Sequence, residues 1–452
     1  MPNTITISTA TPRESSPLQA PSLKSSVQWT LLGYFVYGVC QWMMLIVIAR
    51  LGLPEMVGQF ALAMAVTTPI ILLIGLDLRT VQATDQSNRY PFQDFFTLRL
   101  ISLALALAVI MGFTCWQGYK QETALLVFVM GVAKCAEALS DLCHGVFQQS
   151  ERLDQMARAR ILRGVLTVAV LGAGLYFSRS LLIATGALAL LWIGILVGYD
   201  WPVAFKLLRR QGQSTSLVRL DWSQLWVLLA AALPTGLLTC QASLEQSLPR
   251  LFIDSYLGEH ELGIYSAVSS LIMASSMVIN AVHSAVLPRM AKHACSRQWA
   301  DTWRILFRLA LLGLVLGGVG TIFVYAFGDW ILSMAFGPAY ASHSQVLVIL
   351  LIGSTIRYAT LALSTALRAA QRFWLLSTLQ TVSLLAATPI MLLSVQSYGS
   401  LGAAYSFVVL AVLFAVLQVP AALLVLRSSA IDFRRQSASP DQVEFAAKRA
   451  AA

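Results

Sequence analysis

Long apolar runs separated by short polar connections dominate the chain from about residue 28 to residue 427. A membrane-spanning helix needs about 20 mainly apolar residues. The pattern predicts twelve such segments, at residues 28–49, 56–76, 100–118, 123–147, 161–177, 181–199, 225–256, 262–288, 309–327, 343–367, 373–395 and 401–426. The runs are continuous rather than alternating, which favours helices over barrel strands, because lipid offers no partners to unpaired backbone groups. We therefore expect an all-α integral membrane protein with about twelve transmembrane helices.

Composition excludes a soluble protein. Of the 452 residues, 57% are hydrophobic and 12% are charged, whereas an ordinary soluble domain carries about 25% charged residues. Residues 1–27 are rich in Ser, Thr and Pro and lack the pattern of a cleaved signal peptide, so the first apolar run is expected to be retained. The six cysteines show no paired or metal-like spacing and are interpreted as unpaired packing residues.

The distribution of basic residues predicts the orientation. Most Lys and Arg residues fall in connections on the side that holds both termini, and only three fall in connections on the other side: Arg50, Lys120 and Arg179. This asymmetry is typical of the positive-inside rule and places both termini in the cytoplasm. The net charge of +10 then reflects topology and contact with anionic membrane lipid, and no nucleic-acid partner is expected.

The polar connection 200–224 divides the chain into two sets of six segments. The expected organisation is a cytoplasmic N-terminal tail at 1–27, a first lobe at 28–199, a cytoplasmic linker at 200–224, a second lobe at 225–426 and a cytoplasmic C-terminal tail at 427–452. A short pattern recurs between the first and second segments of each half: Leu51-Gly52 with Gly58-Gln59-Phe60-Ala61, and Leu257-Gly258 with Gly263-Ile264-Tyr265-Ser266. Chance and duplication both remain open, and a duplication would be parallel, with the site between two bundles.

Charged groups within predicted helices are informative, because each costs about 2.5–3.5 kcal/mol at a helix centre and usually faces a cavity or another charge. The fourth segment carries one polar stripe at steps of three and four: Lys134, Glu137, Asp141, His144 and Gln148. Lys134 is a candidate ligand of a phosphate oxygen. Glu137 and Asp141 are candidates for ion coupling, since like charges raise each other's proton affinity. A structural Lys134–Glu137 pair, with His144 as the partner of Asp141, is the alternative.

The seventh segment becomes polar in its second half, which is unlike a lipid-facing helix. Arg250 lies on one polar side of this helix with four other residues, Ser243, Gln246, Ser247 and Asp254. Glu245 is expected on the opposite side of the helix. Arg250 is either a cavity cation or an interfacial anchor that reaches outward.

The tenth segment places Arg357 near its centre, on a stripe with small and hydroxyl residues: Gly353, Ser354, Thr360 and Ser364. A guanidinium group suits phosphate oxygens. A buried ion pair of Arg357 with Glu245 or Asp141 is the alternative. The eighth segment carries Ser269, Ser276, Asn280 and His283 on one face, where these groups would serve interhelical hydrogen bonding or sugar binding.

No Walker-type Gly-Lys-Ser/Thr loop is present in the sequence, so the chain is not expected to hydrolyse ATP. We expect no catalytic residues, no metal and no cofactor. Energy would come from an ion gradient, a partner or the substrate gradient.

Several short motifs resemble Wzx-type O-antigen and exopolysaccharide flippases, which share a superfamily with the multidrug and toxin extrusion transporters. The first comprises Leu51-Gly52, Gly58-Gln59-Phe60-Ala61-Leu62-Ala63-Met64-Ala65, Pro69-Ile70, Leu76-Asp77-Leu78-Arg79 and Asp85. The second comprises Pro249-Arg250-Leu251-Phe252, Leu257-Gly258 and Leu262-Gly263-Ile264-Tyr265, and the third Gly399 with Gly402-Ala403-Ala404. The resemblance spans nearly the whole chain, although each motif is short.

The resemblance implies two six-helix lobes around a central cavity that opens alternately inward and outward, in a bacterial inner membrane. The family moves undecaprenyl-diphosphate-linked oligosaccharide from the cytoplasmic to the periplasmic leaflet and works beside polysaccharide polymerases and assembly proteins. It also implies that Lys134, Arg250 and Arg357 meet the diphosphate, and that Glu137, Asp141, Glu245 and Asn280 are candidates for ion coupling or cavity polar groups.

Two other functions remain open. A drug or metabolite antiporter on the same scaffold would favour an acidic and aromatic cavity over a basic one. A polysaccharide polymerase or ligase would need a sizeable external loop, and the predicted external loops are short.

Overall fold

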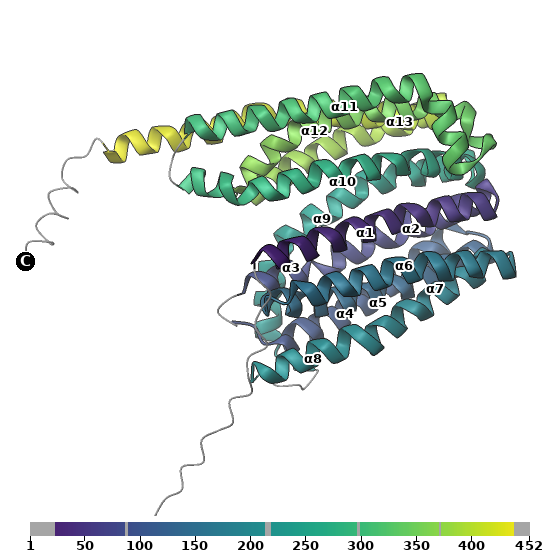
Figure 1. Cartoon of the computed structure of the whole chain (residues 1–452), viewed down its shortest axis with the longest axis horizontal. Helices are drawn as coiled ribbons and strands as arrows, with labels where there is room; N and C mark the ends of the chain where they lie inside the picture. The colour runs from purple at the N-terminus through teal and green to yellow at the C-terminus, as the bar shows by residue number, and fades with distance from the viewer. Residues whose placement is uncertain (1–22, 86–88, 213–217, 296–298, 370–371, 438–452) are drawn as a thin grey trace, which may run out of the picture.

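A computed structural model describes residues 23–85, 89–212, 218–295, 299–369 and 372–437, and this part of the chain is almost entirely helical. The first half contains α1 (Leu23–Leu51), α2 (Pro54–Gly75), α3 (Leu78–Thr84), α4 (Phe92–Gln117), α5 (Gln121–Gln149), α6 (Leu153–Ser178), α7 (Leu181–Ile195), a π-helical turn (Leu196–Asp200) and α8 (Trp201–Arg210). The second half contains α9 (Trp222–Leu257), α10 (Glu259–Cys295), α11 (Trp299–Phe336), a 3-10 turn (Pro338–His343), α12 (Ser344–Ala369) and α13 (Phe373–Ser437). The two halves form two bundles that lie side by side (Figure 1).

All twelve predicted segments fall on helices, which confirms the all-α membrane fold and its two lobes. The last two segments share α13, whose helical backbone is interrupted at Gly399, where φ is 59°. Within the described residues, ten stretches are long and apolar enough to cross a membrane; α13 contributes one of them and α10 none. The number of twelve spanning helices therefore stays a prediction. Two short helices, α3 and α8, lie in connections that the pattern treats as polar loops.

Large apolar side chains cover the outer surface of the bundles. Phe177 and Tyr325 are each 82% exposed, and Leu190 and Ile322 are more than two-thirds exposed. Contiguous apolar surface of this kind is unfavourable in water but is what a helix presents to lipid tails. The surface therefore agrees with a protein embedded in a bilayer.

The two bundles meet closely where α2 crosses α10. A Cβ atom added to Gly58 would lie 1.9 Å from the carbonyl oxygen of Glu259, and one added to Gly263 would lie 1.9 Å from that of Pro54. Each glycine thus contacts the residue four positions before the other glycine. This reciprocity is what a two-fold related pair of repeats produces, and it involves the glycines of the recurring sequence pattern.

The crossing lies at the end of the molecule where α1 joins α2 and α9 joins α10, which we call the distal end. The described chain ends, at the start of α1 and the end of α13, lie at the other end, on the left of Figure 1. At the distal end Glu259 accepts hydrogen bonds from Gln59 and from Thr123, each at 2.9 Å. The Arg50 guanidinium donates to the carbonyl oxygens of the last turn of α11, including that of Ala335 at 3.1 Å. These contacts hold the lobes together at the distal end.

Candidate functional site

A cavity of about 340 Å³ lies within the second bundle, between α9, α10, α12 and α13. Three arginines line it, Arg250 from α9 and Arg357 and Arg368 from α12. Glu245 is the one carboxylate among the described residues that line it. The cavity therefore has an excess of positive charge, which suits an anionic ligand.

Six of the eight described residues of α12 that line the cavity follow one another at alternating steps of four and three. They are Leu350, Ser354, Arg357, Leu361, Ser364 and Arg368. This spacing keeps them on one face of a helix. Arg357 and Arg368 are eleven residues apart, so their backbones are separated by about 16 Å along the helix axis at 1.5 Å per residue. The two guanidinium groups are thus placed at different depths of one face.

Arg357 forms an ion pair with Glu245, which is one of the two alternatives that the sequence leaves open. The Glu245 carboxylate is only 3% exposed and also accepts a 2.8 Å hydrogen bond from Gln380. The side chain of Arg357 is 31% exposed and its guanidinium carbon lies 5.7 Å from the centre of the Phe407 ring. Arg357 therefore keeps accessible donors while Glu245 holds it in place.

Glu245 is predicted on the side of α9 opposite to the polar stripe of Arg250, and both residues nevertheless line the same cavity. The cavity extends around α9 from Tyr265 on α10 to Gln380 on α13, so side chains on two sides of α9 reach it.

Arg250 differs from Arg357 in lacking a carboxylate at ion-pair distance within the described part of the chain. Its Nε atom is buried without a hydrogen-bond partner there. Tyr265, which is 4% exposed, also lines the cavity beside it. A cation with a buried, unpartnered donor is costly in a folded protein, so Arg250 has donors available to a ligand anion.

Hydroxyl groups form much of the remaining polar surface of the cavity. Five Ser and Thr residues contribute: Ser269, Ser276, Ser354, Thr360 and Ser364. All five belong to the stripes predicted on the eighth and tenth segments. The side chain of Asn280, predicted on the same face as Ser276, lies outside the part that the structure describes.

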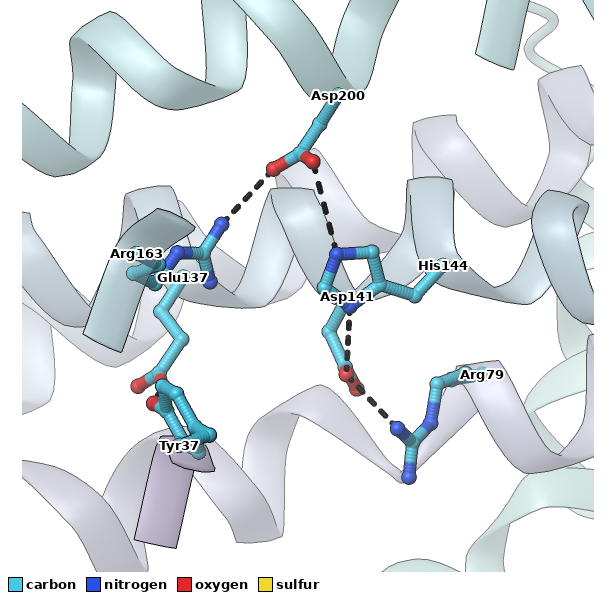
Figure 2. Close-up of polar contacts among 7 residues, drawn as sticks. All are labelled: Tyr37, Arg79, Glu137, Asp141, His144, Arg163 and Asp200. Atoms are coloured by element: carbon cyan, nitrogen blue, oxygen red, sulfur yellow. Dashed lines mark hydrogen bonds and ion pairs between the residues drawn. The ribbon is translucent and has the colours of Figure 1, made fainter. Parts of the chain in front are cut away.

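The first bundle holds the polar stripe of α5, away from this cavity. Lys134 pairs with Glu137 at 2.8 Å, and Tyr37 donates to Glu137 at 2.6 Å. Asp141 pairs with Arg79 of α3 at 3.2 Å, as Figure 2 shows. Lys134 is not among the residues that line the arginine cavity, because α5 packs against helices of its own bundle. The structure thus separates Lys134 from Arg250 and Arg357.

Three charged residues of these sites were not predicted. Arg368 falls in the loop predicted after residue 367, although it lies about three helical turns after Arg357. Arg163 lies within the predicted segment 161–177, and Asp200 falls in the predicted linker 200–224. The π-helical turn carries Asp200 into the bundle, where its Oδ2 atom accepts a 2.8 Å hydrogen bond from Arg163.

Comparison with known proteins agrees with this architecture. The CapF capsular polysaccharide biosynthesis protein of Staphylococcus aureus is 22% identical over 372 residues, which are 82% of this chain and 92% of that protein. The structure of the lipid II flippase MurJ in an inward closed conformation matches with a TM-score of 0.71 and 11% identity, over 90% of this chain and 91% of that one. An inward-facing MATE family multidrug transporter of the MOP superfamily matches with a TM-score of 0.66 and 13% identity, over 89% and 95%.

At these identities the structural matches establish the fold alone, and family membership rests on the sequence. The polysaccharide biosynthesis protein family matches residues 23–294, which is more than half of the chain. This match confirms the resemblance seen in the short motifs, and the chain belongs to the polysaccharide biosynthesis protein family.

Proposed function

We propose that this protein is a flippase that moves an oligosaccharide linked to a polyprenyl diphosphate from the cytoplasmic to the periplasmic leaflet of a bacterial inner membrane. The observation that carries the proposal is the cavity lined by Arg250, Arg357 and Arg368, with Glu245 as the one carboxylate among its described lining residues. Guanidinium groups bind phosphate oxygens through paired, charge-assisted hydrogen bonds. The family match and the names of CapF and MurJ support a role with lipid-linked saccharides.

The diphosphate engages the arginines while the sugars contact the hydroxyl groups and the polyprenyl chain stays in lipid. A cavity of about 340 Å³ lies at the small end of the range for ligand sites. It holds the diphosphate and the sugar nearest to it, so a longer saccharide requires the lobes to separate. With both termini in the cytoplasm, the distal end faces the periplasm, and the described conformation is the one closed on that side.

A drug antiporter fits this cavity less well. Cationic drugs would meet three guanidinium groups, and Glu245, the one carboxylate among the described lining residues, is already bound to Arg357 and Gln380. We further propose that the protein transports its ligand without changing it chemically. Lys134 as a second diphosphate ligand stays a prediction, since its present partner is Glu137.

Arg250→Gln tests the proposal most cleanly, because Arg250 leaves no carboxylate of the described residues unpaired when it is neutralised. Loss of charge-assisted hydrogen bonds worth about 1.5–3 kcal/mol should reduce surface polysaccharide about tenfold or more. The measurement is surface polysaccharide in cells that carry the variant, together with its abundance in the membrane. Arg308→Gln is the matched control, since Arg308 is exposed on α11 and does not line the cavity. Normal export by a normally abundant Arg250→Gln protein would refute the role of Arg250.

A further inference from the structure

Outside the arginine cavity, the first bundle encloses a buried histidine between two carboxylates (Figure 2). Asp141 and His144 lie one turn apart on α5, and Asp200 approaches from the π-helical turn after α7. The ring atom Nδ1 of His144 lies 4.0 Å from Asp141 Oδ1, and Nε2 lies 3.6 Å from Asp200 Oδ1. His144 is 3% exposed and Asp200 is fully buried, whereas Asp141 is 34% exposed.

Polar atoms at this point have no hydrogen-bond partners among the described residues. They are Ser140 Oγ, His144 Nε2, Asp200 Oδ1 and, on the far side of Asp200, Arg163 Nε. Each buried polar atom of this kind costs about 1–3 kcal/mol. Three of the four atoms belong to Ser140, His144 and Asp200, and the 3.6 Å between His144 Nε2 and Asp200 Oδ1 is longer than a hydrogen bond.

We propose that Asp141, His144 and Asp200 form a proton-binding site that couples the proposed transport to a proton gradient. A proton enters through Asp141, the member of the group that is partly exposed, and binds the free nitrogen of the imidazole ring. Both ring nitrogens then carry hydrogen, so one N–H donates to Asp141 and the other to Asp200. Release follows the reverse route. This inference rests on the proposed function for its coupling, but proton binding itself does not.

Arg79 competes with protonated His144 for the Asp141 carboxylate, and this competition allows the proton to leave the ring. In the described conformation Arg79 pairs with the Asp141 carboxylate at 3.2 Å, so Asp141 is engaged by a fixed cation. When Arg79 withdraws, Asp141 is free to accept from protonated His144. Arg79 and the protonated ring therefore compete for one carboxylate, and the position of α3 decides which of them holds it.

The position of helix α3 depends on how the two lobes are placed relative to each other. It follows α2 through Leu76 and Asp77, whose φ values of 59° and 45° make the connection tight. Gly236 of α9 lies against this connection, where an added Cβ atom would be 2.7 Å from the Cα of Leu76. Movement of α9 with the second lobe therefore displaces the connection and, with it, Arg79.

The positive and negative side chains around His144 are nearly equal in number. One added proton therefore changes the net charge of the site appreciably. Arg163 is the direct partner of Asp200. The other titratable and charged groups that face the site come from six elements: Tyr37 of α1, Asp77 and Arg79 around α3, Arg99 of α4, Lys134, Glu137 and Cys143 of α5, Arg160 of α6, and Tyr199 of the π-helical turn.

Nitrogen-15 histidine NMR of the full-length protein in lipid nanodiscs tests proton binding without any substrate. The His144 signal should change from neutral to charged as the pH is lowered, and Asp200→Asn should move that midpoint down by about one pH unit or more. His283, which hydrogen-bonds Thr365 at 2.9 Å in the second bundle, should not respond to Asp200→Asn. A His144 ring that keeps one charge at every pH at which the protein stays folded, or whose midpoint does not change in Asp200→Asn, overturns the proposal.

The coupling is tested with His144→Gln, which keeps an amide donor but cannot take up a proton. Collapse of the proton gradient by an ionophore should reduce surface polysaccharide severalfold in wild-type cells, and cells with His144→Gln should show one reduced level with and without the ionophore. An unchanged ionophore response in His144→Gln would refute coupling through this site. Failure of the flippase proposal shows up separately, as normal export by Arg250→Gln, and leaves the NMR result standing.

Discussion

Glu245 determines how much of the positive charge in the cavity is available to a ligand. It is buried, it is paired with Arg357, and Gln380 fixes its second oxygen. The sequence predicted this pair only as one of two alternatives, because helical spacing places each residue on a face but does not say which faces meet. Arg368 was not predicted for a different reason, because the expected helix end lies one residue before it and apolar length does not fix a helix end to within a residue.

Arg357→Gln should therefore damage folding as well as export. It leaves the Glu245 carboxylate buried without its cation, which costs up to about 3 kcal/mol. Thermal unfolding in detergent should show the loss, and the double substitution Glu245→Gln/Arg357→Gln should recover most of it because no buried charge is then left alone. Export should stay low in both proteins. A double variant that exports normally would show that Arg357 only neutralises Glu245.

At the scale of helices, the crossing of α2 and α10 depends on Gly58 and Gly263. The sequence repeat marked both glycines, and the structure shows why they recur: each makes room for a backbone carbonyl of the other helix. Apolar length predicted the helices themselves. Short elements such as α3 and α8 were not predicted, since their polar residues match those of a loop.

Gly58→Ala should shift the lobes away from the conformation closed at the distal end. The new methyl group would overlap the carbonyl of Glu259, so the helices must separate. Cysteines introduced at Glu55 and His260, whose side chains are 2.8 Å apart, should form a disulfide severalfold less often in Gly58→Ala. Gly186→Ala is the control, because nothing lies within 4 Å of its added Cβ atom. Equal cross-linking in both variants would contradict a glycine-dependent closure.

At the scale of the molecule, the two lobes followed from apolar length and from the position of the basic connections. The distribution of the buried charged residues between the two lobes was not predicted from the sequence. Lys134 and the arginines were expected to meet one diphosphate, but the structure pairs Lys134 with Glu137 in the first bundle and gathers the arginines in the second. The surroundings of a buried charge depend on the packing between helices that are distant in the sequence. Apolar length and helical spacing do not predict that packing.

The central claim is that this protein carries a diphosphate-linked saccharide across the membrane through the arginine cavity. The most direct measurement is the amount of lipid-linked oligosaccharide exposed on the outer leaflet of spheroplasts, labelled with an impermeant probe. Cells with the wild-type protein should display this pool, and cells that lack the protein or carry Arg250→Gln should retain the same lipid on the inner leaflet. An outer-leaflet pool of equal size in cells without the protein would contradict the account.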